Sequence, residues 1–166
     1  MNVYLVRHGI ALDLGEQGIV RDADRPLSDE GKALTCEVAR GLRAVVGDEA
    51  MRIISSPLLR ARETAEIFAK ALGVATPVET LAELTSEGDV EAVAEWIERQ
   101  PPKSLMMVGH MPDMSDLASC LACPQGVLQV VFKKAAVMRI SFEARAGKGR
   151  GCIEWLLPPG ILRRIA

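Results

Sequence analysis

The chain has 166 residues, of which 49% are hydrophobic and 25% charged, and its formal net charge is −2. This length and composition predict one globular domain over residues 1–166. The near-neutral charge gives no indication of a nucleic-acid or membrane partner, and no apolar run reaches the length of a transmembrane helix.

Short apolar runs and helical patterns alternate from the N-terminus onward. Residues 3–6 are apolar and β-rich, which predicts a buried strand, and residues 9–27 have the composition of a loop. A helix is predicted from Ser28, a good N-cap residue, to Gly47. Residues 51–55 then predict a second strand.

A second helix is predicted after this strand, with Ser56 as its N-cap, Pro57 as its first residue and Gly73 at its end. A weak strand is expected near 77–79. Asp89 is predicted to cap a third helix.

The third helix is predicted to end at Pro101-Pro102, and residues 104–108 form another short apolar strand. Residues 109–112 turn into a further helix with apolar residues at helical spacing. Residues 127–132 are ambiguous between a strand and irregular structure.

The order of these elements predicts an α/β fold, a three-layer sandwich with a mostly parallel central sheet flanked by helices. Residues 137–142 and 152–157 predict two more strands. The glycine-rich segment 146–151 connects them, so we expect an antiparallel edge hairpin near the C-terminus.

The two histidines of the chain each follow a predicted strand. His8 lies in the triplet Arg7-His8-Gly9, and His110 follows the strand 104–108. Ligands of open α/β sheets bind outside the carboxyl ends of the strands, so the two imidazoles are candidates for opposite walls of one pocket. The alternative is two ordinary polar residues in turns, and placement alone favours neither.

Arg60 adds a third group at this edge, because it lies in the first turn of the helix that follows strand 51–55. Helix N-termini and guanidinium groups both favour anions. A surface position is the alternative.

Arg7, His8, Arg60 and His110 together suit phosphoryl transfer. A neutral imidazole attacks phosphorus as a nucleophile, and cationic neighbours stabilise charge on the phosphoryl oxygens. This chemistry needs no metal, and we expect no cofactor.

Three segments resemble motifs of the histidine phosphatase superfamily, which includes the phosphoglycerate mutases. They are Leu5-Val6-Arg7-His8-Gly9, the segment 55–65 and Val108-Gly109-His110, in the order of the family. Within the superfamily the chain is most similar to the short phosphohistidine phosphatases of the SixA type. The segment Arg25-Pro26-Leu27-Ser28-Asp29-Glu30-Gly31 resembles their R-P-L-[ST]-x-x-G pattern, and residues 81–89 resemble another of their segments.

The resemblance implies that His8 is the nucleophile that becomes phosphohistidine. It implies that Arg7, Arg60 and His110 hold the phosphoryl group. Glu83 matches the position where many relatives carry a proton donor, and a surface carboxylate beside a turn is an equal alternative. No metal is implied.

Ile10 departs from the pattern, because many relatives have an acid or amide directly after the R-H-G triplet. A protonated imidazole is a good leaving group, whereas an alkoxide needs a general acid more. The departure therefore favours phosphohistidine as the substrate.

We therefore expect a metal-independent phosphatase that acts on phosphohistidine in a signalling protein, such as a histidine-containing transfer domain. One alternative is a phosphatase of small phosphate esters such as sugar phosphates. An alternative of another class is a non-catalytic phosphate-binding protein.

Other features of the sequence are given structural interpretations. Cys120 and Cys123 are expected to close a helix rather than to hold zinc or form a redox pair. Cys36 and Cys152 are expected in the core. Lys133 and Lys134 could border the pocket, but a solvated strand end is the preferred interpretation.

The N-terminal apolar stretch is too short, and has the wrong flanking residues, for a signal peptide. We therefore expect a cytoplasmic protein whose four cysteines are reduced.

Overall fold

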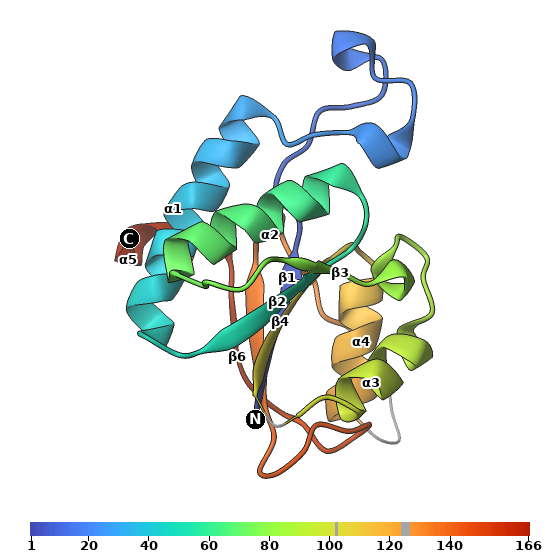
Figure 1. The fold of residues 1–166 in the computed structure, drawn as a ribbon, viewed down its shortest axis with the longest axis vertical. Coiled ribbons are helices and arrows are strands. Elements are labelled where there is room, and N and C mark those ends of the chain that lie inside the picture. The colour runs from blue at the N-terminus through green and yellow to red at the C-terminus, as the bar shows by residue number, and fades with distance from the viewer. Residues whose placement is uncertain (102, 124–126) are drawn as a thin grey trace.

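The computed structural model describes residues 1–101, 103–123 and 127–166, and it confirms the predicted α/β sandwich (Figure 1). Within these residues one sheet has the strand order β3-β2-β4-β1-β5-β6. The first four of these strands are parallel, and β5 and β6 are antiparallel as predicted. The strands are β1 (Asn2–Arg7), β2 (Met51–Ser55), β3 (Glu79–Thr80), β4 (Ser104–Gly109), β5 (Val137–Ser141) and β6 (Cys152–Leu157).

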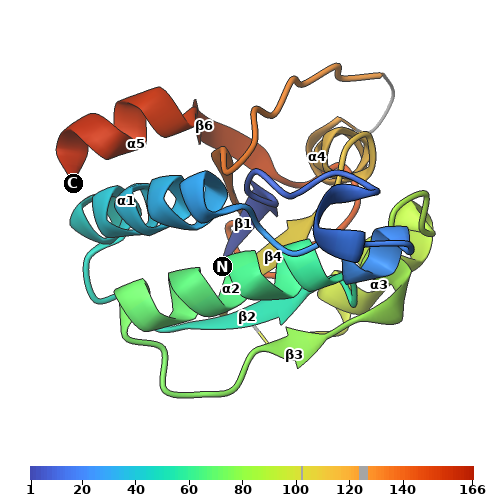
Figure 2. The same ribbon diagram turned by 90° about the horizontal axis from the view of Figure 1, so that it is seen from above.

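Helices cover both faces of the sheet. One face carries α1, α2 and α5, and the other carries α3 and α4 (Figure 2). The helices are α1 (Asp29–Val46), α2 (Leu59–Leu72), α3 (Val90–Glu98), α4 (Asp113–Ala122) and α5 (Pro159–Ile165), with short 3-10 turns η1 (Glu16–Gly18), η2 (Asp22–Asp24) and η3 (Ala82–Leu84). Among the described residues, no helix is long and apolar enough to cross a membrane.

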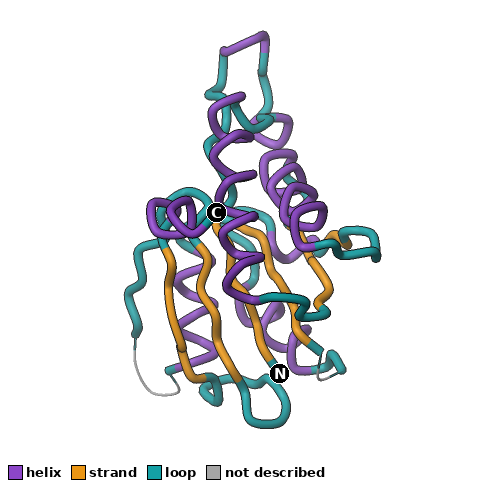
Figure 3. Tube along the Cα trace, turned by 90° about the vertical axis from the view of Figure 1, so that its left-hand side faces the viewer, coloured by secondary structure: helices purple, strands orange, loops and turns teal. Residues whose placement is uncertain are grey.

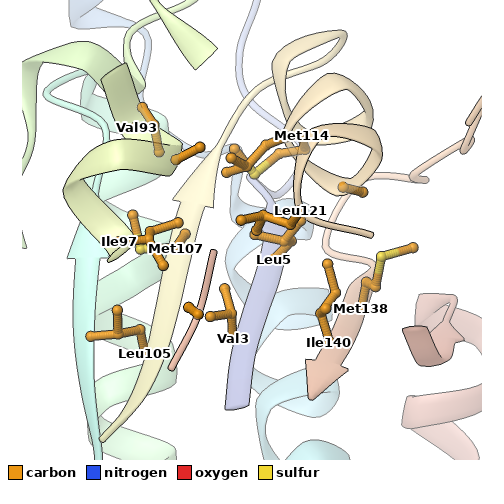
Figure 4. Close-up of a cluster of buried hydrophobic side chains, with 14 of the residues drawn as sticks. Val3, Leu5, Val93, Ile97, Leu105, Met107, Met114, Leu121, Met138 and Ile140 are labelled. Atoms are coloured by element: carbon orange, nitrogen blue, oxygen red, sulfur yellow. The ribbon is translucent and has the colours of Figure 1, made fainter. Parts of the chain in front are cut away.

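The central strands are buried on both faces, as expected for parallel strands between two helical layers. In β1, Val3 and Leu5 pack with Met107 toward α3 and α4 (Figure 4), whereas Tyr4 and Val6 pack toward α1 and α2. All five side chains are fully buried. Each such burial stabilises the fold by about 1.5–3 kcal/mol, so these strands hold the residues that follow them in fixed positions.

The segment between β1 and α1, which contains η1 and η2, extends beyond the carboxyl ends of the parallel strands (Figure 1). The connection between β5 and β6 lies at the opposite end of the sheet (Figures 1 and 3). Because β5 runs antiparallel to β1, β5 begins at the edge where β1 ends. Residues just before β5 therefore lie near those that follow β1.

Two of the predicted helix caps are confirmed. The Ser28 hydroxyl accepts a hydrogen bond from the Gly31 N–H, and the Asp89 carboxylate accepts one from the Ala92 N–H. These caps satisfy backbone donors that would otherwise lack partners at the helix start.

The predicted start of the second helix is wrong, because α2 begins at Leu59. Ser56 still continues the sheet, and its N–H donates to the Val108 carbonyl at 2.9 Å. Its hydroxyl accepts from the Leu58 N–H within the turn that follows.

Two further differences concern the C-terminus and the cysteines. The helix α5 was not predicted, and its buried Leu162 packs against α1. Cys36 and Cys152 are exposed rather than buried, because Cys36 lies on the outer face of α1 and Cys152 begins the edge strand β6. Pro102 of the predicted helix break lies outside the described residues, and residues 127–132 have no regular structure.

Gly41 allows α5 to pack closely on α1. A Cβ atom there would lie 1.9 Å from the Leu162 carbonyl oxygen, a separation that forces the two helices apart. We expect Gly41→Ala to lower the free energy of unfolding by about 1–3 kcal/mol, measured by urea denaturation. Gly160→Ala is the matched control, because no atom lies within 4 Å of its Cβ position. Equal stability of the two variants would contradict this packing.

Candidate active site

The two histidines lie side by side at the carboxyl ends of neighbouring strands. β1 and β4 pair in parallel so that Arg7 is opposite Gly109, and the His8 N–H donates to the Gly109 carbonyl at 3.0 Å. The ring centroids of His8 and His110 are 5.0 Å apart, with an interplanar angle of 52°. Both residues are buried: His8 is 4% exposed to solvent and His110 is 2% exposed.

One hydrogen bond defines the proton position on His8. Its Nδ1 lies 2.8 Å from the Gly9 carbonyl oxygen, which can only accept, so Nδ1 carries the proton. The lone pair of the neutral ring is therefore on Nε2. A neutral imidazole with an available lone pair is a nucleophile.

Glycines hold the turn after His8 tightly against α1. A Cβ atom on Gly9 would lie 2.5 Å from the Thr35 hydroxyl, and one on Gly31 would lie 2.0 Å from the Ile10 carbonyl oxygen. The Gly9 N–H also donates to the Thr64 hydroxyl of α2 at 3.0 Å. The glycine of the R-P-L-[ST]-x-x-G pattern thus allows α1 to contact this turn.

His110 contacts the third strand end through Ser56. The imidazole Nε2 and the Ser56 hydroxyl are 2.7 Å apart. The other ring nitrogen, Nδ1, is buried and has no hydrogen-bond partner among the described residues. Ser56 was not predicted as a site residue, although it directly follows β2 at the same sheet edge.

Arg60 lies at the start of α2, 5% exposed, and its guanidinium binds the loop that follows β1. It donates to the Asp22 carbonyl at 2.8 Å and to the Asp22 carboxylate at 2.9 Å. Arg25 pairs with the same carboxylate. Partial burial opposes ionisation of Asp22, but hydrogen bonds from Arg25 and Arg60 hold its pKa below the usual value.

Arg7 is half-buried beside His8. Its Nη1 donates to the Phe132 carbonyl at 2.7 Å, whereas its Nε is buried and without a partner within the described part of the chain. Burial lowers the pKa of this guanidinium, which nevertheless stays protonated. Arg7 therefore contributes a fixed positive charge to the site.

Lys134 is the residue that sequence analysis misplaced. Its Nζ lies 3.2 Å from Nε2 of His8, so the preferred interpretation as a solvated strand end is wrong for this lysine. Lys133 is exposed. The available signal was the antiparallel direction of the C-terminal hairpin, which brings the residues before β5 to the end of β1.

Burial, reinforced by nearby positive groups, keeps both imidazoles neutral. Burial, followed by Lys134, His110 and Arg60, lowers the pKa of His8 to about 2. Burial, followed by Arg60 and Lys134, lowers the pKa of His110 to about 4. The structure thus brings Lys134 together with the four residues that the sequence predicted for the site. The resulting cluster is cationic and partly buried, and its other members are Arg7, His8, Arg60 and His110. Such a cluster suits an anion with several oxygens.

Glu83 is not joined to this cluster by any contact of the described residues. It lies on η3, which follows β3 at the same sheet edge, and its side chain is exposed. Ile10 is half-buried, and its carbonyl accepts from the Ser28 N–H at 3.0 Å. No carboxylate therefore stands directly after the R-H-G triplet.

The described residues include no group of three or more histidine, cysteine or acidic side chains that could hold a metal ion. Cys120 and Cys123 are free thiols at the end of α4, which confirms the prediction that they close a helix.

The chain is similar to several known proteins. A family model described as the histidine phosphatase superfamily, branch 1, matches residues 3–116. An uncharacterized protein of Picosynechococcus sp. is 38% identical over 154 residues, covering 90% of this chain and 88% of that protein. Phosphohistidine phosphatase SixA of Escherichia coli is 29% identical over 167 aligned positions, covering 98% and 97%. A solved structure of the protein histidine phosphatase SixA complexed with tungstate has a TM-score of 0.83 at 26% identity, covering 96% of this chain and 98% of that one.

The low pKa values of the two histidines predict a pH-dependent stability. An unfolded histidine binds a proton below about pH 6.5, whereas both folded rings resist protonation. The contribution of the two histidines to the free energy of unfolding is therefore expected to be fully present above pH 6.5 and to be lost as the pH falls, down to about 4 for His110 and about 2 for His8. Urea denaturation measures this, and the double variant His8→Asn/His110→Asn should show a flatter profile. An NMR titration in which either ring signal shifts with a midpoint near 6.5 would contradict the assignment.

Proposed function

The chain belongs to the histidine phosphatase superfamily, and we propose that it is a metal-independent phosphatase that uses His8 as its nucleophile and phosphohistidine in a protein as its substrate. The observation that carries the proposal is the neutral His8 ring, whose Nε2 lone pair lies among cationic groups at the open edge of the sheet. The resemblance over nearly the whole length of Escherichia coli SixA supports the substrate class.

The proposed reaction has two phosphoryl transfers. First, the lone pair of His8 Nε2 forms a bond to phosphorus while the bond from phosphorus to the substrate's imidazole nitrogen breaks. The substrate ring is protonated on its other nitrogen, so the leaving nitrogen takes the electron pair and the ring departs as neutral imidazole. Then water attacks phosphorus, the bond to Nε2 breaks, and His8 regains its lone pair. Both protons of the water stay with the product, which leaves as dihydrogen phosphate. The proton on Nδ1 stays in its hydrogen bond to the Gly9 carbonyl throughout.

The remaining residues have binding roles in this proposal. Arg7, Arg60 and His110 hold the phosphoryl oxygens, on which charge accumulates in the transition state. Arg60 uses two N–H groups for Asp22, which leaves its other N–H groups for the substrate. Glu83 is the proposed proton donor, on the basis of the family pattern.

Replacement of His8 tests the nucleophile. His8→Asn retains a polar side chain of similar reach but lacks the imidazole lone pair, so we expect turnover of a phosphorylated histidine-containing transfer protein to become undetectable. A circular dichroism melt of the variant checks that it is folded. Undiminished turnover by a folded His8→Asn variant would rule out the mechanism.

Ile10 supports phosphohistidine over the alternative substrates, small phosphate esters such as sugar phosphates. Without an acid beside the nucleophile, an alkoxide leaving group would depend on Glu83 alone for its proton, whereas a protonated imidazole leaves readily. The hydrophobic side chain at this position is thus compatible with a phosphoramidate bond.

A substrate panel decides between these classes. We expect the wild-type protein to have a higher kcat/KM for phosphohistidine in a protein than for any small phosphate ester. Ile10→Glu should raise kcat/KM for an ester by up to about 10²-fold, because it adds a carboxylic acid beside the nucleophile. A wild-type preference for a small ester would instead support the alternative.

A further inference from the structure

Lys134 lies in a turn that the backbone of the nucleophile segment fixes in place. The Ala135 N–H donates to the carbonyls of Arg7 and His8, at 3.0 and 3.2 Å, and the Arg7 N–H donates to the Ala136 carbonyl at 3.3 Å. The Ala136 N–H closes the turn onto the Lys133 carbonyl at 2.9 Å, with Ala135 at a φ of 62°. These bonds place the backbone of Lys134 directly beside the R-H-G triplet.

The Lys134 side chain is directed at the reacting nitrogen. Its ammonium donates toward Nε2 of His8 at 3.2 Å, and Nε2 carries the lone pair because Nδ1 is protonated. Among the described residues, no carboxylate lies within ion-pair distance of this ammonium. A half-buried cation whose hydrogen-bond contact is a neutral ring, with three arginines and a single carboxylate, Asp13, around it at longer range, is an incomplete anion site.

We propose that Lys134 is a catalytic residue of the reaction proposed above: its ammonium binds Nε2 of His8 in the free protein and moves to a phosphoryl oxygen when Nε2 attacks phosphorus. This inference rests on the proposed function. It adds to the phosphoryl-binding set a residue that the sequence motifs do not contain.

The exchange of partners is favourable for physical reasons. A donor within hydrogen-bond distance of Nε2 is also within reach of oxygens on a phosphorus atom bonded to Nε2. A charged phosphoryl oxygen is a stronger hydrogen-bond acceptor than a neutral imidazole. The ammonium therefore forms a stronger hydrogen bond when it moves from Nε2 to a phosphoryl oxygen. The proton stays on Lys134, because the pKa of His8 is about 2 and that of Lys134 is about 8. Lys134 therefore stabilises charge without transferring a proton.

The charge of Lys134 gives the proposal a pH signature. Burial, followed by Arg7, Arg60 and Arg25, lowers the pKa of Lys134 to about 8, and Asp13 opposes this shift. The groups that face it come from three elements and their adjoining loops: Arg7, His8, Asp13, Arg25, Arg60 and His110. As the pH rises above 8, the free protein loses this positive charge, so kcat/KM is expected to fall.

Three variants test the proposal with a synthetic phosphohistidine peptide as substrate and tungstate as an oxyanion probe. Lys134→Met should lower kcat/KM about 10²-fold, the usual effect of removing one donor to developing charge, and should weaken tungstate binding. Lys134→Arg should retain activity and lose the decrease above pH 8, because arginine stays protonated. Lys133→Met, the exposed neighbour, is the matched control and should behave as wild type.

The proposal is overturned if Lys134→Met matches wild type in both kcat/KM and tungstate affinity. It is also overturned if Lys134→Arg keeps the decrease above pH 8. Failure of the proposed function has a different signature, namely no turnover and no phosphorylated His8 in the wild-type protein. The tungstate measurement still tests Lys134 in that case, because it needs no reaction.

Discussion

The parallel pairing of β1 with β4 is the constraint on which the site depends. It places Arg7 opposite Gly109, so the residues that follow, His8 and His110, must lie next to each other where the strands end. Neither strand can shift its register without moving fully buried side chains out of both helical layers. The energy that fixes the two imidazoles therefore comes from the hydrophobic core on either side of the sheet, far from the polar groups of the site.

Burial and neighbouring positive charges together determine the protonation state of the site. Burial among cations makes protonation of His8 unfavourable, and the Gly9 carbonyl holds the remaining ring proton on Nδ1. Asp22, in the loop after β1, is the carboxylate that pairs with Arg60, and it also pairs with Arg25. A protein with a net charge of −2 thus concentrates positive charge where the strands end. This arrangement prepares an unprotonated nucleophile beside groups that attract a phosphoryl group.

The parts of this arrangement that depend on chain order were predictable from sequence. Apolar runs indicated the strands, and the rule for open α/β sheets brought His8, His110 and Arg60 to one edge. Ser28 and Asp89 also cap helices as predicted.

The parts of the site and fold that depend on tertiary contacts were not predictable. Ser56 pairs with β4 instead of capping α2, and Lys134 reaches His8 only because β5 runs antiparallel beside β1. α5 is short and was missed because its stability comes from packing on α1 rather than from a long apolar pattern.

The most direct test of the account is the position of the phosphoryl group on the enzyme. Rapid mixing of the wild-type protein with a phosphoryl donor, followed by alkaline quenching and ³¹P NMR with peptide mapping, identifies both the histidine and the ring nitrogen. We predict phosphorylation of His8 on Nε2, because Nδ1 is protonated and hydrogen-bonded to the Gly9 carbonyl. Phosphorylation of His110, or of Nδ1 of His8, would contradict it.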